Sequence, residues 1–240
     1  MKIPKGTIKE LTIKSNELGE EMLLLIYLPA NFSPLYKYSL LIAQDGRDYF
    51  QLGRIGRLAD EYLFAKEIEN LIIVGIPYKN VEDRRRKYHP DSDQHQQYIR
   101  FLAHELVPFL DQEFPTYQIG STRALIGDSL GATVSLLTAL QYPHTFGKVL
   151  LQSPYVDEQV MGMVKSFTKT EFLEIYHIVG NQETEVQTTN GKISDFLTPN
   201  RELSTILTSK SITYFYDEFN GDHTWAHWQP DLKRAIKMMF

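Results

Sequence analysis

The chain has 240 residues, of which 42% are hydrophobic, and its formal net charge at pH 7 is −5. This length and composition suit one domain over residues 1–240 with a sizeable core, and the acidic balance argues against nucleic acid or an anionic membrane surface as a partner. The absence of cysteine from the sequence excludes disulfides, a thiol nucleophile and zinc held by cysteine.

The N-terminal part of the chain begins with a predicted antiparallel pair of strands. Residues 7–15 alternate polar and apolar side chains, and residues 21–29 follow a polar turn that contains Gly19, which predicts a hairpin at a sheet edge. Residues 1–15 have no long apolar core, and the apolar run at 22–28 is much too short to cross a bilayer. We therefore expect a cytoplasmic protein without a membrane partner.

The rest of the chain alternates predicted strands with predicted helices. Short apolar runs rich in β-branched residues predict strands, and apolar residues spaced three or four apart predict helices. The predicted strands cover residues 39–43, 71–77, 122–126, 148–152, 173–179 and 212–216. The predicted helices cover residues 54–68, 94–114, 130–142, 157–167, 201–207 and 231–239, and polar loops are expected at 80–93 and 180–194. This alternation predicts an α/β fold: a three-layer α/β/α sandwich whose mostly parallel sheet binds ligands at the carboxyl ends of its strands.

The strongest functional signal lies between the predicted strand at 122–126 and the predicted helix at 130–142. Residues 127–131 read GDSLG, a G-x-S-x-G motif. This motif is typical of a nucleophile elbow, in which a strained turn exposes the serine hydroxyl and small neighbours let the helix approach the strand. We therefore predict that Ser129 is a nucleophile.

The letters GDSL at residues 127–130 also match the name motif of a different serine-esterase family, which has a flavodoxin-like fold. In that family the motif lies close to the N-terminus, and a D-x-x-H motif lies near the end. Here the motif is in mid-chain, and Asn220 rather than aspartate stands three residues before His223. The nucleophile elbow is the better interpretation.

A serine hydroxyl needs a base that accepts its proton, and histidine is suited to that role. Five of the seven histidines are better explained by the surface, a helix end, the core or a non-reacting place near the site: His89, His95, His104, His144 and His177. His223 follows the last predicted strand, where the elbow architecture places its base, and we predict that it is the base. His227 completes an H-x-x-x-H spacing, but Thr224 replaces the glutamate of the zinc motif and no third ligand is evident. We expect no metal and no cofactor.

The acid that orients such a histidine lies between the serine and the histidine in the sequence. The loop after the predicted strand at 173–179 offers two glutamates, Glu183 and Glu185. We favour Glu183, because it stands three residues past the glycine that ends the strand and so lies close to the sheet. Further candidates are Asp157, Asp195 and Asp217.

An oxyanion hole needs two hydrogen-bond donors beside the serine. We expect one to be the backbone N–H of Leu130, directly after the nucleophile. The second is expected from the loop at residues 45–47, which follows the predicted strand at 39–43 and contains Gly46. An ordinary β-turn is the alternative interpretation of this loop.

Five separated motifs occur here in the order found in one known family. They are Asp45-Gly46 after an apolar strand, Arg86-x-Tyr88-x-Pro90, Gly127-x-Ser129-x-Gly131, Gly180-x-x-Glu183 and Gly221-x-His223-x-Trp225-x-x-Trp228. From about Glu21 to its end, the chain resembles the esterase D and enterochelin (siderophore) esterase branch of the α/β-hydrolases. The resemblance implies the α/β-hydrolase fold and the following roles: nucleophile Ser129, base His223, acid Glu183 and second oxyanion donor the N–H of Arg47. The chain departs from the family at Ala132, where a second glycine is common, and some siderophore hydrolases of this type use a Ser-His dyad without the acid.

We therefore predict a serine carboxylic-ester hydrolase that acts through an acyl-enzyme on a small-molecule ester. Siderophore-type esters or lactones are the leading substrate class. The basic run at residues 84–87 predicts contact with an anionic or catecholate-bearing ester, and the expected substrate contacts are Arg86, Tyr88 and Trp225. A solvated basic surface and aromatic packing under the histidine loop are the alternative explanations. The alternative functions are acyl transfer and non-catalytic binding, and the oligomeric state is not predicted.

Overall fold

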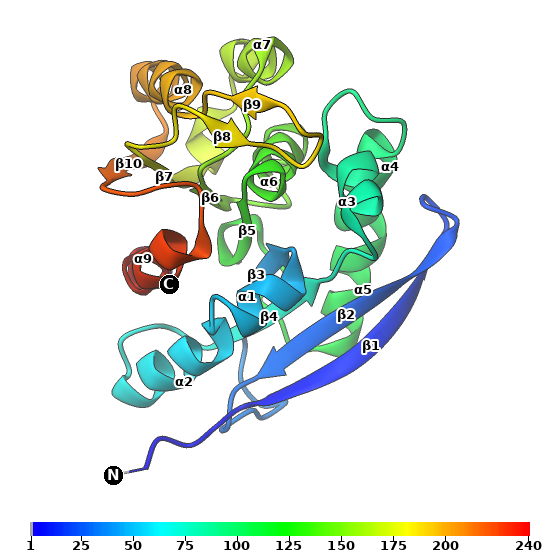
Figure 1. The fold of residues 1–240 in the computed structure, drawn as a ribbon. Coiled ribbons are helices and arrows are strands. Elements are labelled where there is room, and N and C mark those ends of the chain that lie inside the picture. Colours follow the sequence, from blue (N-terminus) through cyan, green and yellow to red (C-terminus); the bar gives the residue numbers. More distant parts are fainter. Residues whose placement is uncertain (1) are drawn as a thin grey trace.

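The computed structural model describes residues 2–240 and shows a twisted sheet between two layers of helices (Figure 1). Within those residues, eight strands form the main sheet in the order β1-β2-β4-β3-β5-β6-β7-β10. The strands are β1 (Thr7–Ser15), β2 (Glu20–Leu28), β3 (Ser39–Gln44), β4 (Leu71–Ile76), β5 (Arg123–Asp128), β6 (Lys148–Gln152), β7 (Glu174–Gly180) and β10 (Thr213–Phe219). Strand β2 is antiparallel to both β1 and β4, and the remaining pairs are parallel. The predicted edge hairpin and mostly parallel sheet are confirmed.

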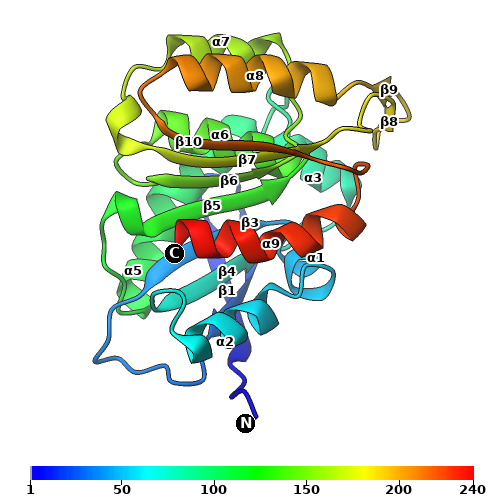
Figure 2. The same cartoon turned by 90° about the vertical axis from the view of Figure 1, so that its left-hand side faces the viewer.

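Helices cover both faces of this sheet (Figure 2). One face carries α1 (Gly46–Gln51), α2 (Ile55–Ala65) and α9 (Trp225–Met239). The other carries α3 (Val81–Tyr88), α4 (His95–Arg100), η1 (Phe101–Leu106), α5 (Val107–Glu113), α6 (Leu130–Gln141), α7 (Glu158–Ser166) and α8 (Leu197–Ser209). Two short 3₁₀ turns, η2 (Gly120–Thr122) and η3 (Thr170–Phe172), precede β5 and β7. Each face has its own buried apolar cluster, as expected for a three-layer α/β/α sandwich.

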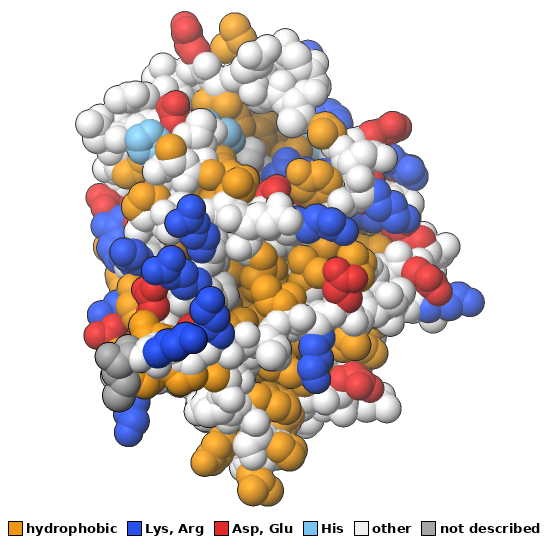
Figure 3. Space-filling view, turned by 60° about the horizontal axis from the view of Figure 1, so that its bottom comes forward, with side chains coloured by type: hydrophobic (Ala, Val, Ile, Leu, Met, Phe, Trp, Pro, Cys, Tyr) orange, Lys and Arg blue, Asp and Glu red, His pale blue; other side chains and the backbone are white. Residues whose placement is uncertain are grey.

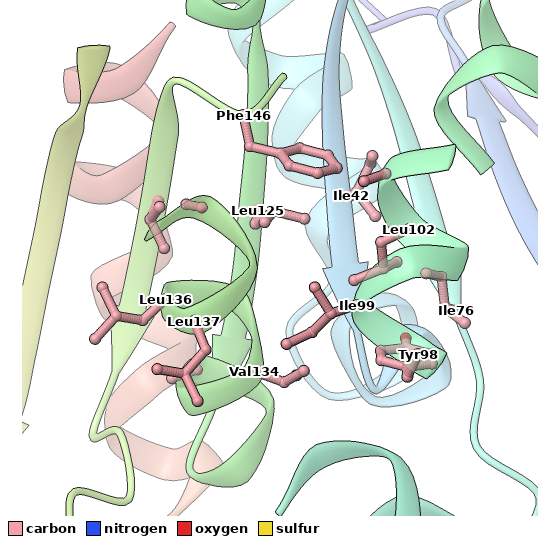
Figure 4. Packing of buried hydrophobic residues seen from close by; sticks show 14 of the residues in the cluster. Ile42, Ile76, Tyr98, Ile99, Leu102, Leu125, Val134, Leu136, Leu137 and Phe146 are labelled. Carbon is pink, nitrogen blue, oxygen red and sulfur yellow. The ribbon is translucent and has the colours of Figure 1, made fainter. Parts of the chain in front are cut away.

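Helix α6 follows directly after Ser129 and is buried from Leu130 to Leu140. Its side chains meet those of α4 and η1 on the same face of the sheet, over strands β3 and β5, as Figure 4 shows for Val134 and Ile99. A helix that is buried on every side belongs to the core, and close packing then sets its position. The segment that carries the serine is therefore held by the most buried helix of the fold.

The prediction of a polar loop at residues 80–93 is wrong, because α3 forms there. Asn80 caps this helix: its side chain accepts a hydrogen bond of 2.9 Å from the N–H of Asp83. Lys87 forms an ion pair with Asp83 one turn earlier, at 2.7 Å. The helix is polar over most of its length, so the apolar spacing on which the prediction depended is missing.

The predicted helix at 94–114 is one continuous helix with a widened turn in its middle. That turn, η1, is a π-helix, in which the N–H of Val107 donates to the carbonyl of Leu102, five residues back. Pro108 follows directly; proline has no N–H and its ring crowds the carbonyl four residues earlier, which accounts for the widening.

Two further differences lie near the C-terminus. Helix α9 begins at Trp225, six residues before the predicted start, and includes Pro230. The expected loop at 180–194 contains a short antiparallel pair, β8 (Val186–Gln187) and β9 (Ile193–Ser194).

Among residues 2–240, no helix combines the length and apolar character that crossing a bilayer requires.

Candidate active site

Ser129 stands at the tip of the turn between β5 and α6. Its backbone has φ 52° and ψ −124°, a conformation that non-glycine residues rarely adopt. The N–H of Ser129 donates to the carbonyl of Gln152 at the end of β6, at 2.9 Å. A Cβ added to Gly127 would lie 2.2 Å from the backbone carbon of Gly131, so helix and strand approach too closely for a side chain at residue 127. This is the geometry of a nucleophile elbow.

The loops after β7 and β10 bring Glu183 and His223 together. The two strands are parallel neighbours in which Gly180 pairs with Phe219, so the chain leaves both strands at the same point of the sheet edge. Beyond these positions, Oε2 of Glu183 lies 2.6 Å from Nδ1 of His223. Glu185, by contrast, is exposed.

The carboxylate of Glu183 is fully buried and has further hydrogen-bond donors. Its Oε1 accepts from the N–H of Gly180 at 2.8 Å and from the hydroxyl of Ser153 at 2.6 Å. Ser153 in turn accepts from the indole N–H of Trp228 at 3.1 Å. Because several donors face the carboxylate, its negative charge is compensated in the interior and its orientation is set.

The ring of His223 is held by aromatic neighbours. Phe196 and Trp228 have ring centroids 4.4 Å and 4.8 Å from that of the imidazole. With Nδ1 against Glu183, the remaining ring nitrogen, Nε2, is the one available for chemistry. Within the described residues, Ser129 and His223 form no hydrogen bond with each other. In enzymes without bound substrate, the hydrogen bond between a nucleophile and its base is often long and shortens when substrate binds.

Ser129 and His223 line one cavity of about 500 Å³. Aromatic side chains form much of its wall: Tyr78, Tyr155, Phe196, Trp225 and Trp228. The β8–β9 segment adds a polar wall with Gln187, Thr188, Thr189, Asn190, Lys192 and Ser194. The surface in Figure 3 is hollowed in its upper part, and its lysine and arginine side chains alternate with acidic and apolar ones rather than forming one basic field. A cavity with aromatic walls and a few polar groups suits a small organic ligand.

Three aspartates line the cavity: Asp45, Asp48 and Asp128. Burial, reinforced by the nearby charge of Asp45, raises the pKa of Asp128 to about 8, although the guanidinium of Arg84 opposes the shift. Asp128 Oδ1 is buried without a hydrogen-bond partner among the described residues. The residue next to the serine therefore carries a carboxyl group whose pKa lies well above the ordinary value for aspartate.

The loop predicted to provide the second oxyanion donor lies beside the serine turn. Asp45 has φ 52°, and a Cβ added to Gly46 would lie 2.4 Å from the backbone of Gly75 on β4, so this turn packs directly on the sheet. Arg47 and Leu130 are in the first turns of α1 and α6, where backbone N–H groups have no acceptor within the helix. The side chain of Arg47 is exposed, so only its backbone is a candidate.

Two predicted substrate contacts lie outside the cavity. Arg86 is exposed and pairs with Asp93 at 3.4 Å, whereas Tyr88 is buried, and its hydroxyl accepts from the N–H of Asp45 at 3.2 Å. Because this segment is helical, its side chains point in different directions, and the residues of α3 that line the cavity are Val81, Arg84 and Arg85. The third predicted contact, Trp225, does line the cavity.

The other histidines lie as follows. His177 is fully buried between the hydroxyl of Tyr214 and the side-chain carbonyl of Asn200, which confirms its place in the core. His89 lines the cavity, and His95 is buried away from it. His104, which is predicted to lie on the surface, and His144, which is predicted to lie at a helix end, are both exposed. His227 Nε2 lies 3.3 Å from Asp222 Oδ1, and residues 2–240 contain no group of three or more His, Asp or Glu side chains arranged to hold a metal.

Sequence reasoning missed Ser153. It follows the end of β6, has φ 48°, and its N–H donates to the carbonyl of Ile178 at 2.8 Å. The available signal was weak: a serine directly after a predicted strand, at the sheet edge where ligands bind. Its contact with Glu183 spans 30 positions of the chain and follows from the sheet order alone.

Comparison with known proteins gives a family and a fold. Residues 15–239 match the model of the family described as "Putative esterase". The protein described as "Uncharacterized protein YjcH" of Bacillus subtilis (strain 168) is 56% identical over 234 residues, which cover 98% of both chains.

Two solved structures resemble this one at low sequence identity. A ferulic acid esterase superposes with a TM-score of 0.79 at 15% identity, over 98% of this chain and 97% of the other. The enterobactin esterase FES from Shigella flexneri, solved in the presence of enterobactin, superposes with a TM-score of 0.84 at 18% identity. That match covers 98% of this chain and 59% of FES, so the chain spans about three fifths of it. These likenesses establish the α/β-hydrolase fold.

Proposed function

The chain belongs to the esterase family, and from this premise we propose that it hydrolyses carboxylic esters through an acyl-enzyme formed on Ser129. One observation carries the proposal. Glu183 and His223 form a 2.6 Å hydrogen bond beside the cavity in which Ser129 occupies a strained turn. A serine, a histidine and a buried carboxylate in this relation are the groups that acyl transfer to water requires.

The proposed reaction has two halves. Ser129 Oγ attacks the ester carbonyl carbon while His223 Nε2 takes the hydroxyl proton, and Glu183 stabilises the resulting imidazolium. The oxyanion of the tetrahedral intermediate accepts hydrogen bonds from the N–H groups of Leu130 and Arg47. The C–O bond then breaks, and His223 returns the proton to the leaving alcohol. Water repeats the attack with the same base, which releases the carboxylic acid and restores Ser129.

Siderophore-type esters and lactones are the proposed substrate class. The aromatic cavity wall suits flat acyl groups, and Arg85 and Lys192 supply positive charge for phenolate or carboxylate groups. The enterobactin esterase with the same fold is consistent with this class but, at 18% identity, does not assign it. Acyl transfer is the second candidate, because an alcohol in place of water completes the same cycle.

Replacing Ser129 tests the activity. We expect Ser129→Ala to lower kcat for an aryl acetate by about 10⁴-fold or more, with an unchanged unfolding midpoint, because no other hydroxyl takes its place in the turn. A fluorophosphonate should add once to the wild-type protein, and peptide mapping should find the adduct on Ser129.

A variant that keeps wild-type turnover would remove Ser129 from the mechanism. Stoichiometric ligand binding by a wild-type protein that never releases aryl alcohol would support non-catalytic binding instead. Product analysis with added alcohol distinguishes ester hydrolysis from acyl transfer, because a transferase forms a new ester whereas a hydrolase forms the free acid.

A further inference from the structure

Arg84 on α3 connects the two loops that flank the serine. Its Nε lies 2.9 and 3.0 Å from the two carboxylate oxygens of Asp45, and its Nη2 lies 2.6 Å from Asp45 Oδ2. The same Nη2 donates to the backbone carbonyl of Asp128 at 3.2 Å, one residue before Ser129. One guanidinium therefore forms hydrogen bonds to both the loop after β3 and the serine turn after β5. The planar arrangement of its N–H donors allows this, whereas the compact ammonium group of a lysine has no such fork.

The carboxylate of Asp45 is also in contact with the serine-bearing helix. A Cβ added to Gly131 would lie 3.1 Å from Asp45 Oδ2, so the second glycine of the G-x-S-x-G motif leaves room for this carboxylate. The Asp45 side chain is 2% exposed and that of Arg84 is 11% exposed. Removal of Arg84 would leave a buried carboxylate unpaired beside the place where the oxyanion forms.

We propose that Arg84 is a positioning residue for the oxyanion hole: its fork to Asp45 and to the Asp128 carbonyl sets the distance between the backbone N–H groups of Arg47 and Leu130. The inference rests on the proposed esterase function. Asp45 is in a left-handed conformation, which costs backbone energy and persists only where its surroundings hold it. Arg84 provides such a constraint through the side chain, and the Tyr88 hydroxyl provides another through the Asp45 N–H.

The position has a specific kinetic consequence. The two N–H groups act on the oxyanion, a species that exists only after attack, so their misplacement weakens transition-state binding more than substrate binding. We expect Arg84→Ala to lower kcat for an aryl acetate by about 10²- to 10³-fold, the range found when one oxyanion donor is lost, with KM within about threefold. Arg84→Lys should fall between the wild type and the alanine variant, because lysine keeps the charge without the fork.

Chemical rescue separates positioning from general damage. The alanine variant leaves a space that a guanidinium ion can enter, so about 50 mM guanidinium chloride should raise its kcat at least tenfold. The same concentration of urea should not, because urea is uncharged.

The matched control is Arg123→Ala. Arg123 is a buried arginine at the other end of β5, 8% exposed and paired with Asp111 at 2.5 Å. Its loss should destabilise the fold as much as the loss of Arg84, but kcat should stay within about threefold and should not respond to guanidinium. Equal losses of kcat in the two variants, or an Arg84→Ala effect confined to KM, would overturn the inference.

Amide hydrogen exchange tests the same inference without activity. In Arg84→Ala, the amides of residues 45–49 should exchange at least tenfold faster than in the wild type, and in Arg123→Ala they should not change. If the wild-type protein cleaves no ester and takes no fluorophosphonate, the proposed function fails, whereas unchanged exchange in Arg84→Ala removes the role of Arg84 by itself.

Discussion

At the scale of single residues, Glu183 shows how a carboxylate is accommodated when it is fully buried. Its two oxygens receive hydrogen bonds from His223, Ser153 and the N–H of Gly180. A carboxylate that is fully satisfied in the interior keeps one orientation, and it can stabilise an imidazolium more effectively than a carboxylate surrounded by water. Glu185, two residues later, is exposed and has no such environment.

The first prediction compares these two glutamates. We expect Glu183→Gln to lower kcat for an aryl acetate by about 10²- to 10⁴-fold, because an amide stabilises neither the imidazolium nor its orientation. Glu185→Gln should stay within about threefold of the wild type and serves as the matched control. Steady-state kinetics with the unfolding midpoint of each variant decides the question, and an active Glu183→Gln protein would point to a Ser-His dyad.

At the scale of elements, the segment between Glu183 and Phe196 forms a loop whose two ends are joined by backbone hydrogen bonds. The N–H groups of Phe196 and Leu197 both donate to the carbonyl of Glu183, at 2.8 and 3.1 Å. The chain between them forms the β8–β9 pair, in which Val186 is paired with Ser194. The hairpin contributes a cavity wall while its base is anchored at Glu183, so the wall can be altered without displacing the carboxylate.

The second prediction removes this wall. Replacing residues 186–194 by two glycines should leave kcat for phenyl acetate within about threefold, because the paired ends of the hairpin already lie side by side. The wild type should prefer a cyclic triester of an aromatic acylserine over phenyl acetate by at least tenfold in kcat/KM, and the shortened variant should lose this preference through KM.

The exposed Ile193 provides the control, since Ile193→Ser changes the hairpin without touching the cavity lining. A wild type without the preference would reject the siderophore-type class but not the esterase. A shortened variant that retains the preference would remove the hairpin from substrate selection.

At the scale of the whole molecule, His177 links three elements of the core. It lies on β7 and contacts Tyr214 on β10 at 2.8 Å and Asn200 on α8 at 2.7 Å. Burial lowers the pKa of His177 to about 4, although the hydrogen bond to Asn200 acts in the opposite direction. In the unfolded chain the imidazole has its ordinary pKa, near 6.5. Between these values the unfolded chain binds the proton and the folded chain does not, so acidification favours unfolding.

The third prediction follows from that sign. The contribution of His177 to the free energy of unfolding is fully present above about pH 6.5 and is lost as the pH falls towards 4, by at most about 1.4 kcal/mol per pH unit. In urea titrations between pH 7 and 4.5, His177→Gln should therefore lose less of its unfolding free energy than the wild type. Replacement of the exposed His144 by glutamine should preserve the wild-type slope, and parallel curves for wild type and His177→Gln would contradict the prediction.

The features that the sequence by itself determined are those encoded by neighbouring residues. The edge hairpin, the strand-helix alternation and the turn at Ser129 were predicted because a two-residue period, a helical period and a five-residue motif can each be read within one segment. Where the local pattern is absent, the prediction fails. Helix α3 has no apolar period, and α9 contains Pro230 in its interior, where proline is normally disfavoured.

Only the tertiary structure decided which distant groups meet. The bond between Glu183 and His223 spans 40 positions, and the contact of Arg84 with Asp45 spans 39. Both depend on the order of the parallel strands, which brings the ends of β3, β4, β5, β7 and β10 to one edge of the sheet. The sequence ranked Glu183 above Glu185 by its distance from a strand end, but the direction of a side chain and the burial of its charge follow from packing against Ser153 and Trp228. Close packing is a property of the assembled layers, and no single segment contains it.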